Sequence, residues 1–207
     1  GNAVPFAIGG FSSRTVQTVV AEGEPVGFIR GYKAVLNPDN SLKEILPLQN
    51  LGSTLPTAYG NFSLSASYKN LSFMLSGDYQ YGAYVHSFDR QFRFSKGLKD
   101  DAIPEKALEG LDQGANWLNF TNFFVEKSDF LKIRNIGIAY DYKPKKYLKS
   151  VNLAFNVYNP FAFTASSVDP EAALAGARSQ GAVAVGGLNY SSYSTPRQYV
   201  GTIRVSF

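Results

Sequence analysis

Alternation of apolar and polar residues is the main pattern in this sequence, and it is clearest on both sides of residue 70. From 61 to 68 the even-numbered residues are Phe, Leu, Ala and Tyr, and the odd-numbered ones are Asn or Ser. From 71 to 80 the odd-numbered residues are the apolar ones. Because successive side chains of a strand point to opposite faces, this stretch predicts a hairpin turning at 69–70, with one apolar and one polar face.

Weaker or shorter alternation predicts further strands along the chain. The segment 130–142 reads as a strong strand with a bulge near Asn135, where the alternation slips. We expect seven strands in total, with 3–10 as a candidate eighth; the others besides 130–142 are 14–21, 26–35, 61–68, 71–80, 151–158 and 199–207. Tyrosines 68, 79, 81 and 84 stand near strand ends, as an aromatic girdle at a membrane interface would.

The last strand of the printed sequence has the same two-faced character. Counting back from Phe207, alternate residues are apolar, aromatic or Gly, and those between them are mostly polar. About ten residues also suffice for a tilted strand to cross a bilayer. We therefore expect a barrel-closing strand that the barrel assembly machinery recognises, through Tyr199, Ile203, Val205 and Phe207. An amphipathic strand of a soluble sheet would show the same alternation.

The connections differ in length in a regular way. The turns expected at 22–25, 69–70 and 143–149 are short, whereas 36–56, 86–127 and 160–196 read as long segments, with a short helix within 104–111. Outer-membrane barrels combine short periplasmic turns with long external loops. The asymmetry therefore favours a transmembrane barrel over a soluble meander.

Composition removes several other classes. There is no run of 18 apolar residues, which excludes a transmembrane helix. The net charge of +4 is too small and dispersed to indicate nucleic-acid binding. The chain contains no Cys and a single His, His86, so a zinc site made of His and Cys is excluded.

Enzymatic chemistry finds little support in the sequence. A catalytic triad would need His86 as its base, and Ser87 and Asp89 are neighbours of it only in sequence. The carboxylates between 100 and 112 read as a solvated external loop. The aromatic residues between 117 and 124 read as packing. We expect no enzyme activity and no cofactor.

Several segments resemble the carboxyl-terminal part of the SusC/RagA-type TonB-dependent transporters of the Bacteroidetes outer membrane. The segment 125–136, VEKSDFLKIRNI, is similar to that family's V-x-D-A-S-F-L-R-L-K-N-hydrophobic motif. Asn159-Pro160-Phe161 followed by Asp169-Pro170-Glu171 resembles its N-L-F…D-P-E, with Pro160 in place of the usual Leu. Further similarity lies in 23–33 and 59–71, and the exit at 141–144 departs from the family pattern.

The resemblance implies an all-β fold: an antiparallel 22-stranded transmembrane barrel in which residues 1–207 supply the last seven or eight strands. It implies that the plug domain and the segment contacting TonB lie upstream, outside this chain. It also implies a multi-pass outer-membrane location, contact with lipid, a SusD-like lipoprotein partner, and import of glycans or peptides.

Three alternatives remain open at this point. The barrel could act as a structural scaffold of an outer-membrane complex and not import. The chain could form a small self-contained barrel of eight strands, although the serines at 63–76 suit a wide, water-filled interior better. It could also be a soluble β-sandwich, in which case a second protein layer would cover the apolar side of the strands.

Overall fold

The computed structural model describes residues 6–10, 17–144, 148–169, 171, 188–189 and 193–207. The chain divides into two compact units. The packed unit comprises Gly1–Thr57, Tyr81–Asp129 and Thr164–Ser194, and the sheet unit comprises Ala58–Gln80, Phe130–Phe163 and Thr195–Phe207.

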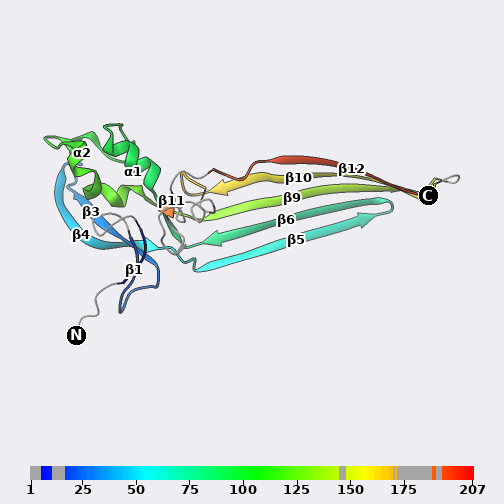
Figure 1. Ribbon diagram of the computed structural model, residues 1–207, viewed down its shortest axis with the longest axis horizontal. Helices are drawn as coiled ribbons and strands as arrows, with labels where there is room; N and C mark the ends of the chain where they lie inside the picture. The colour runs from blue at the N-terminus through cyan, green and yellow to red at the C-terminus, as the bar shows by residue number, and fades with distance from the viewer. Residues whose placement is uncertain (1–5, 11–16, 145–147, 170, 172–187, 190–192) are drawn as a thin grey trace. The chain divides into compact units, whose positions relative to one another are not determined.

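The sheet unit is built on five long strands that lie side by side (Figure 1). Their order in the sheet is β12-β10-β9-β6-β5. The strands are β5 (Ala58–Tyr68), β6 (Leu71–Tyr81), β9 (Phe130–Tyr142), β10 (Ser150–Thr164) and β12 (Gln198–Ser206). The hairpin expected at 69–70 is confirmed, and so are the strands at 130–142 and at the end of the sequence.

The pairing of β6 with β9 is antiparallel and contains the expected bulge. Leu71 pairs with Tyr140, and the ladder continues until Ser76 pairs with Asn135. Gly77 then pairs with Ile133, so that Arg134 is the extra residue. An extra residue reverses the parity of a strand, which explains why the alternation of 130–142 slips at this point.

The apolar face of this sheet is bare. Phe155 is 47% exposed, Ile138 47% and Ile203 74%, and many other large apolar side chains of the five strands are exposed as well. Both clusters of buried apolar residues in the described part of the chain belong to the packed unit. Among the residues that the structure describes, no second protein layer seals the apolar side of the strands, as the soluble sandwich would require.

The packed unit contains two small sheets. The larger has the order β1-β2-β3-β4 and the smaller has the order β11-β7-β8. The strands are β1 (Phe6–Gly10), β2 (Gln17–Val20), β3 (Phe28–Leu36), β4 (Leu42–Ser53), β7 (Tyr84–Ser87), β8 (Val125–Lys127) and β11 (Leu188–Asn189).

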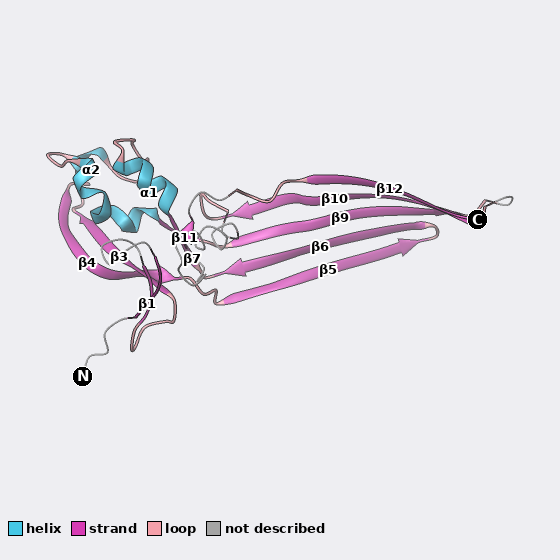
Figure 2. Ribbon diagram, in the orientation of Figure 1, coloured by secondary structure: helices cyan, strands magenta, loops and turns pink. Residues whose placement is uncertain are grey.

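Short helices follow β7 and pack against β3 and β4 (Figure 2). They are α1 (Phe88–Ser95), η1 (Glu105–Leu108), α2 (Gln113–Asn116) and η2 (Trp117–Phe124). Phe94, Phe120 and Phe124 are completely buried between them and the strands. The interpretation of the aromatic residues at 117–124 as packing is thus confirmed. A Cβ at Gly31 of β3 would come within 2.7 Å of the Thr121 methyl group, so this close approach requires glycine.

Several expectations need correction. The long antiparallel sheet has five strands and not seven or eight, because β2 and β3, near the expected strands at 14–21 and 26–35, form a separate sheet with β1 and β4. We expected 36–56 to be a long connection, yet most of it is β4; Pro47 and the left-handed Leu48 break its alternation. Strand β10 continues through Pro160 to Thr164. Tyr84 does stand at a strand end, as expected, but it begins β7 outside the long sheet and packs with Ile29.

Candidate functional site

The polar face of the long sheet carries a series of hydrogen bonds between neighbouring strands. The Arg134 guanidinium donates two hydrogen bonds to the Asp78 carboxylate, one of them from Nη2 to Oδ2 at 2.8 Å. Asn152 Nδ2 donates to Asp141 Oδ1 at 2.7 Å. Two-pronged pairing of Arg with a carboxylate fixes geometry as well as charge. These side-chain hydrogen bonds therefore lie on the polar face, whereas the apolar face exposes many of its large side chains.

The asparagines in the middle of β9 and β10 lie close together on this face. A Cβ at Gly137 would come within 2.4 Å of Asn156 Oδ1 and 3.8 Å of Asn135 Nδ2, so a larger residue would require the Asn156 side chain to move. Asn135 is 7% exposed, and its Oδ1 has no hydrogen-bond partner among the described residues. The centre of the polar face is thus crowded with amide groups rather than with apolar side chains.

The four residues that we assigned to a barrel-closing strand lie in or directly after β12, at one edge of the sheet. Tyr199, Ile203, Val205 and Phe207 are all exposed. The ring of Tyr199 stacks on Phe155 of the neighbouring strand at 6.5 Å between centroids. Their share in closing a barrel stays a prediction, since β12 has a described partner, β10, on one side only.

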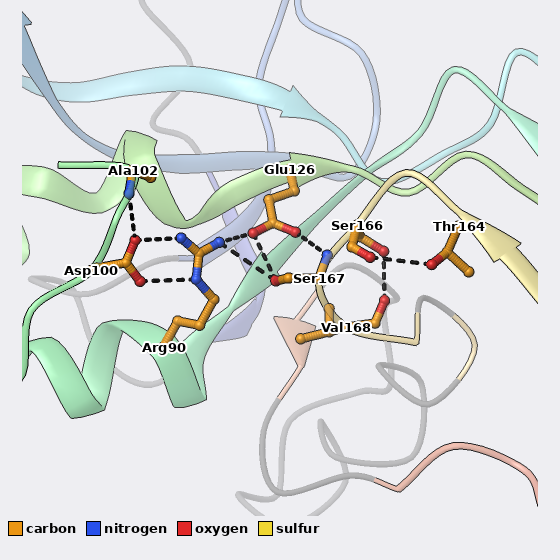
Figure 3. Close-up of polar contacts among 8 residues, drawn as sticks. All are labelled: Arg90, Asp100, Ala102, Glu126, Thr164, Ser166, Ser167 and Val168. Carbon is orange, nitrogen blue, oxygen red and sulfur yellow. Dashed lines mark hydrogen bonds and ion pairs between the residues drawn. The ribbon is translucent and has the colours of Figure 1, made fainter.

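The strongest charge cluster in the packed unit is centred on Arg90 of α1 (Figure 3). Its Nε and Nη2 donate to the two oxygens of Asp100 at 2.9 and 2.5 Å, and its Nη1 forms an ion pair with Glu126 of β8. Glu126 also accepts hydrogen bonds from the Ser167 backbone N–H and hydroxyl. The Arg90, Asp100 and Glu126 side chains are only 21, 12 and 18% exposed. Arg90 therefore joins α1, the loop after it, β8 and the segment after β10.

The local environment lowers the pKa values of two carboxylates in the packed unit, Asp100 and Asp39. Partial burial opposes ionisation of Asp100, but hydrogen bonds from Arg90 and the Ala102 N–H outweigh it and lower its pKa. Hydrogen bonds from Lys106 and Ser41 hold the pKa of Asp39 well below its usual value. The Lys106–Asp39 pair connects η1 to the β3–β4 turn. These carboxylates are bound to cations or to N–H groups, which suits a structural role.

His86 is buried in a second polar network. Its Nε2 lies 2.6 Å from Gln91 Oε1, and Gln91 Nε2 donates to Thr121 Oγ1 at 2.9 Å. Burial lowers the pKa of His86 to about 4, with the Gln91 hydrogen bond acting in the opposite direction. An imidazole bonded to an amide and shielded from solvent is not placed as the base of a triad with Ser87 and Asp89. Its role in this unit is that of a packed polar residue.

Two further features bear on the class of site. Within the described residues, no group of three or more His, Cys, Asp or Glu side chains is arranged to hold a metal ion. No described helix combines the length and the apolar character that a membrane crossing by a helix requires.

Comparison with known proteins gives a structural match only. Neither models of protein families nor curated protein sequences give a significant match to the chain. Solved structures of the RagAB peptide importer are similar to it: the open-open state with a TM-score of 0.62, the closed-closed state with 0.64, and the RagAB peptide transporter with 0.61. Each is 19% identical, and each comparison covers 95% of this chain and 24% of the other.

This likeness shows the fold. The chain has the fold of a segment of these transporter chains and spans about a quarter of their length. Its antiparallel strands and exposed sheet edges are consistent with a fragment of a β-barrel, and the described residues form no closed barrel.

Sequence reasoning missed the Arg90 cluster. Arg90, Asp100, Glu126 and Ser167 are separated by up to 77 positions, and no local pattern connects them. The polar face of the long sheet, in contrast, was predicted from alternation alone. The Asp78–Arg134 pair is visible in the sequence only if the bulge at β9 is placed correctly.

Proposed function

We propose that this chain forms part of the wall and the external loops of an outer-membrane TonB-dependent importer. One observation carries the proposal: the long sheet exposes its apolar face and hydrogen-bonds across its polar face. In water that arrangement is unfavourable, because apolar surface stays hydrated. In a barrel, lipid covers the outside and the polar side faces the interior. The similarity to the RagAB importer over 95% of the chain supports the same conclusion.

The finer parts of the proposal follow from the family resemblance. Residues 1–207 would belong to the carboxyl-terminal part of a 22-stranded barrel, with a plug domain and the TonB-contacting segment upstream. Strands β5 and β12 are the two edges of the described sheet, so each has an edge at which a barrel could continue. Tyr199, Ile203, Val205 and Phe207 of this region would then act in barrel closure and in recognition by the barrel assembly machinery.

The proposed partner and ligand come from the same source. A SusD-like lipoprotein would cover the external face, and the imported ligand would be a glycan or a peptide. The RagAB structures are described as those of a peptide importer, which favours peptides. The packed unit would then form part of the external loops, held in shape by the Arg90 cluster.

Uptake by cells is the direct test of this function. A strain lacking the whole gene, and the same strain complemented with it, are compared for growth on a casein peptide digest and on defined polysaccharides. We expect growth on one of these sources to depend on the gene and to be lost when TonB is removed. Membrane-inserted protein with unchanged growth on every source would favour the scaffold interpretation. Protein found only in the soluble fraction would contradict both.

A further inference from the structure

The apolar face of the long sheet contains a shallow groove near the ends of β6, β9 and β10. Its walls are formed by Leu71, Ile138, Tyr140, Leu153 and Phe155, with the backbone and alanines between them, and its volume is about 260 Å³. All of its lining residues are apolar or aromatic. Leu71 directly follows the 69–70 turn, and Tyr140 stands two residues before the end of β9.

Three lysines lie beyond this end of the groove. Lys69 precedes Leu71 by two residues, Lys143 follows Tyr140 by three, and Lys149 precedes Leu153 by four. At a rise of roughly 3.3 Å per residue, each lies about 7 to 13 Å along the chain from a groove residue. All three are exposed, and none forms an ion pair with a carboxylate of the described residues.

Around this end, one carboxylate of the strands, Asp141, accompanies the three lysines. Asp141 of β9 alternates with Tyr140 and Tyr142, so it belongs to the polar face, where it accepts the hydrogen bond from Asn152. Lys69 lies 5.2 Å above the ring of Tyr68, which is itself exposed. Exposed Tyr rings beside cations are typical of the level of lipid headgroups. The groove therefore combines an apolar trough with a cationic end.

We propose that this groove binds one glycerophospholipid with an anionic headgroup, its acyl chain in the trough and its phosphate beside the lysines. The inference rests on the proposed function, because the groove meets lipid only if the sheet spans a membrane. Short connections lie on the periplasmic side of outer-membrane barrels, and the leaflet there consists of phospholipid. Clusters of basic residues next to apolar surface recognise anionic headgroups in this way.

The test uses the full-length protein, purified from membranes and examined by native mass spectrometry. Phosphatidylglycerol and phosphatidylcholine with identical acyl chains are added in turn. We expect phosphatidylglycerol to bind roughly tenfold more tightly, given the attraction of several lysines near the surface. The triple variant Lys69→Gln, Lys143→Gln, Lys149→Gln should lose that preference. Leu153→Trp, which fills the trough, should weaken the binding of both lipids.

Matched controls decide whether the effect belongs to this site. Lys33→Gln, Lys43→Gln and Lys127→Gln remove the same charge from the packed unit, and Leu64→Trp enlarges an exposed apolar residue of the same sheet outside the groove. Equal binding of the two lipids, or equal effects of Leu64→Trp and Leu153→Trp, would overturn the proposal. Inserted protein without lipid preference refutes the groove alone, whereas protein that does not insert into membranes refutes the proposed function as well.

Discussion

The packed unit and the long sheet use apolar residues in opposite ways. In the packed unit, the ring of Phe94 packs against those of Phe120 and Phe124, at 5.8 and 5.5 Å between ring centroids. In the sheet, Phe155 and Ile138 remain exposed while Asp78 and Arg134 bind each other. One unit has the interior of a water-soluble protein. The other leaves its apolar face exposed and forms its side-chain hydrogen bonds on the polar face, which is the arrangement that the proposed membrane location predicts.

The largest expected difference lies between phenylalanines of the two units. Phe94→Ala removes a fully buried ring and leaves a cavity, which should cost about 3–5 kcal/mol of unfolding free energy. Phe155→Ala should cost about 2 kcal/mol in a membrane, because lipid fills the space and only the transfer of the ring is lost. Urea unfolding of the full-length protein in lipid vesicles, followed by hydrogen exchange of each unit, measures both. Equal costs would contradict the proposal that Phe94 is surrounded by protein and Phe155 by lipid.

Adding a charge to either face of the sheet should give the next largest effect. Ile138→Arg places a cation on the apolar face, where it should cost about 2–4 kcal/mol near the middle of a bilayer. Ser65→Arg on the polar face should leave the folded fraction nearly unchanged, because that side faces water. The folded fraction is measured by the mobility shift on heating in electrophoresis. A larger loss from Ser65→Arg would reverse the assignment of the faces.

Acid should weaken the packed unit through His86. The pKa of His86 is about 4 in the folded protein, against 6.5 for an unperturbed histidine such as that of the unfolded chain. Between pH 4 and 6.5, His86 is therefore protonated in the unfolded chain but not in the folded one. The unfolding free energy should therefore be constant above pH 6.5 and fall by about 3 kcal/mol on acidification to pH 4. Hydrogen exchange at 84–87, corrected for intrinsic rates, measures this. In His86→Gln the slope should disappear; an unchanged slope would exclude His86 as its cause.

The smallest expected effect is the difference in stability lost when a half-buried or an exposed ion pair is broken. Arg90→Gln removes the cation that Asp100 and Glu126 share, which should cost about 2 kcal/mol. Lys99→Gln breaks the fully exposed pair with Glu105 and should have a much smaller effect. Protease cleavage within 96–112 provides the readout. Equal cleavage of both variants would show that the Arg90 cluster does not hold these segments.

The same contrast explains how far the sequence could be interpreted. Strands β5, β6 and β9 were predictable because alternation with period two follows from the backbone itself and needs no distant partner. The apolar face that this alternation predicts is exposed, and its contact with lipid stays a prediction. Helix α1 was missed because Phe88, Phe92 and Phe94 give it no long helical period within eight residues.

The charge clusters could not be predicted, for a physical reason. An ion pair such as Arg90–Glu126 depends on how α1 and β8 pack, and neither segment carries a local signal of the other. His86 illustrates the same limit, since its burial is set by Gln91 and by the pairing of β7 with β8. Sequence patterns thus identified the exposed apolar face of the long sheet but not the contacts that shape the packed unit.

Spin labelling along β6 tests most directly whether lipid covers the apolar face. The chain contains no Cys, so single cysteines can be placed from 71 to 80 in the full-length protein, with any others removed. In vesicles, we expect collisions with oxygen, which dissolves in lipid, to be most frequent at Leu71, Phe73 and Leu75. Collisions with a water-soluble nickel reagent should be most frequent at Ser72, Met74 and Ser76. Apolar-face positions shielded from oxygen, or reached by nickel as readily as their neighbours, would contradict the account.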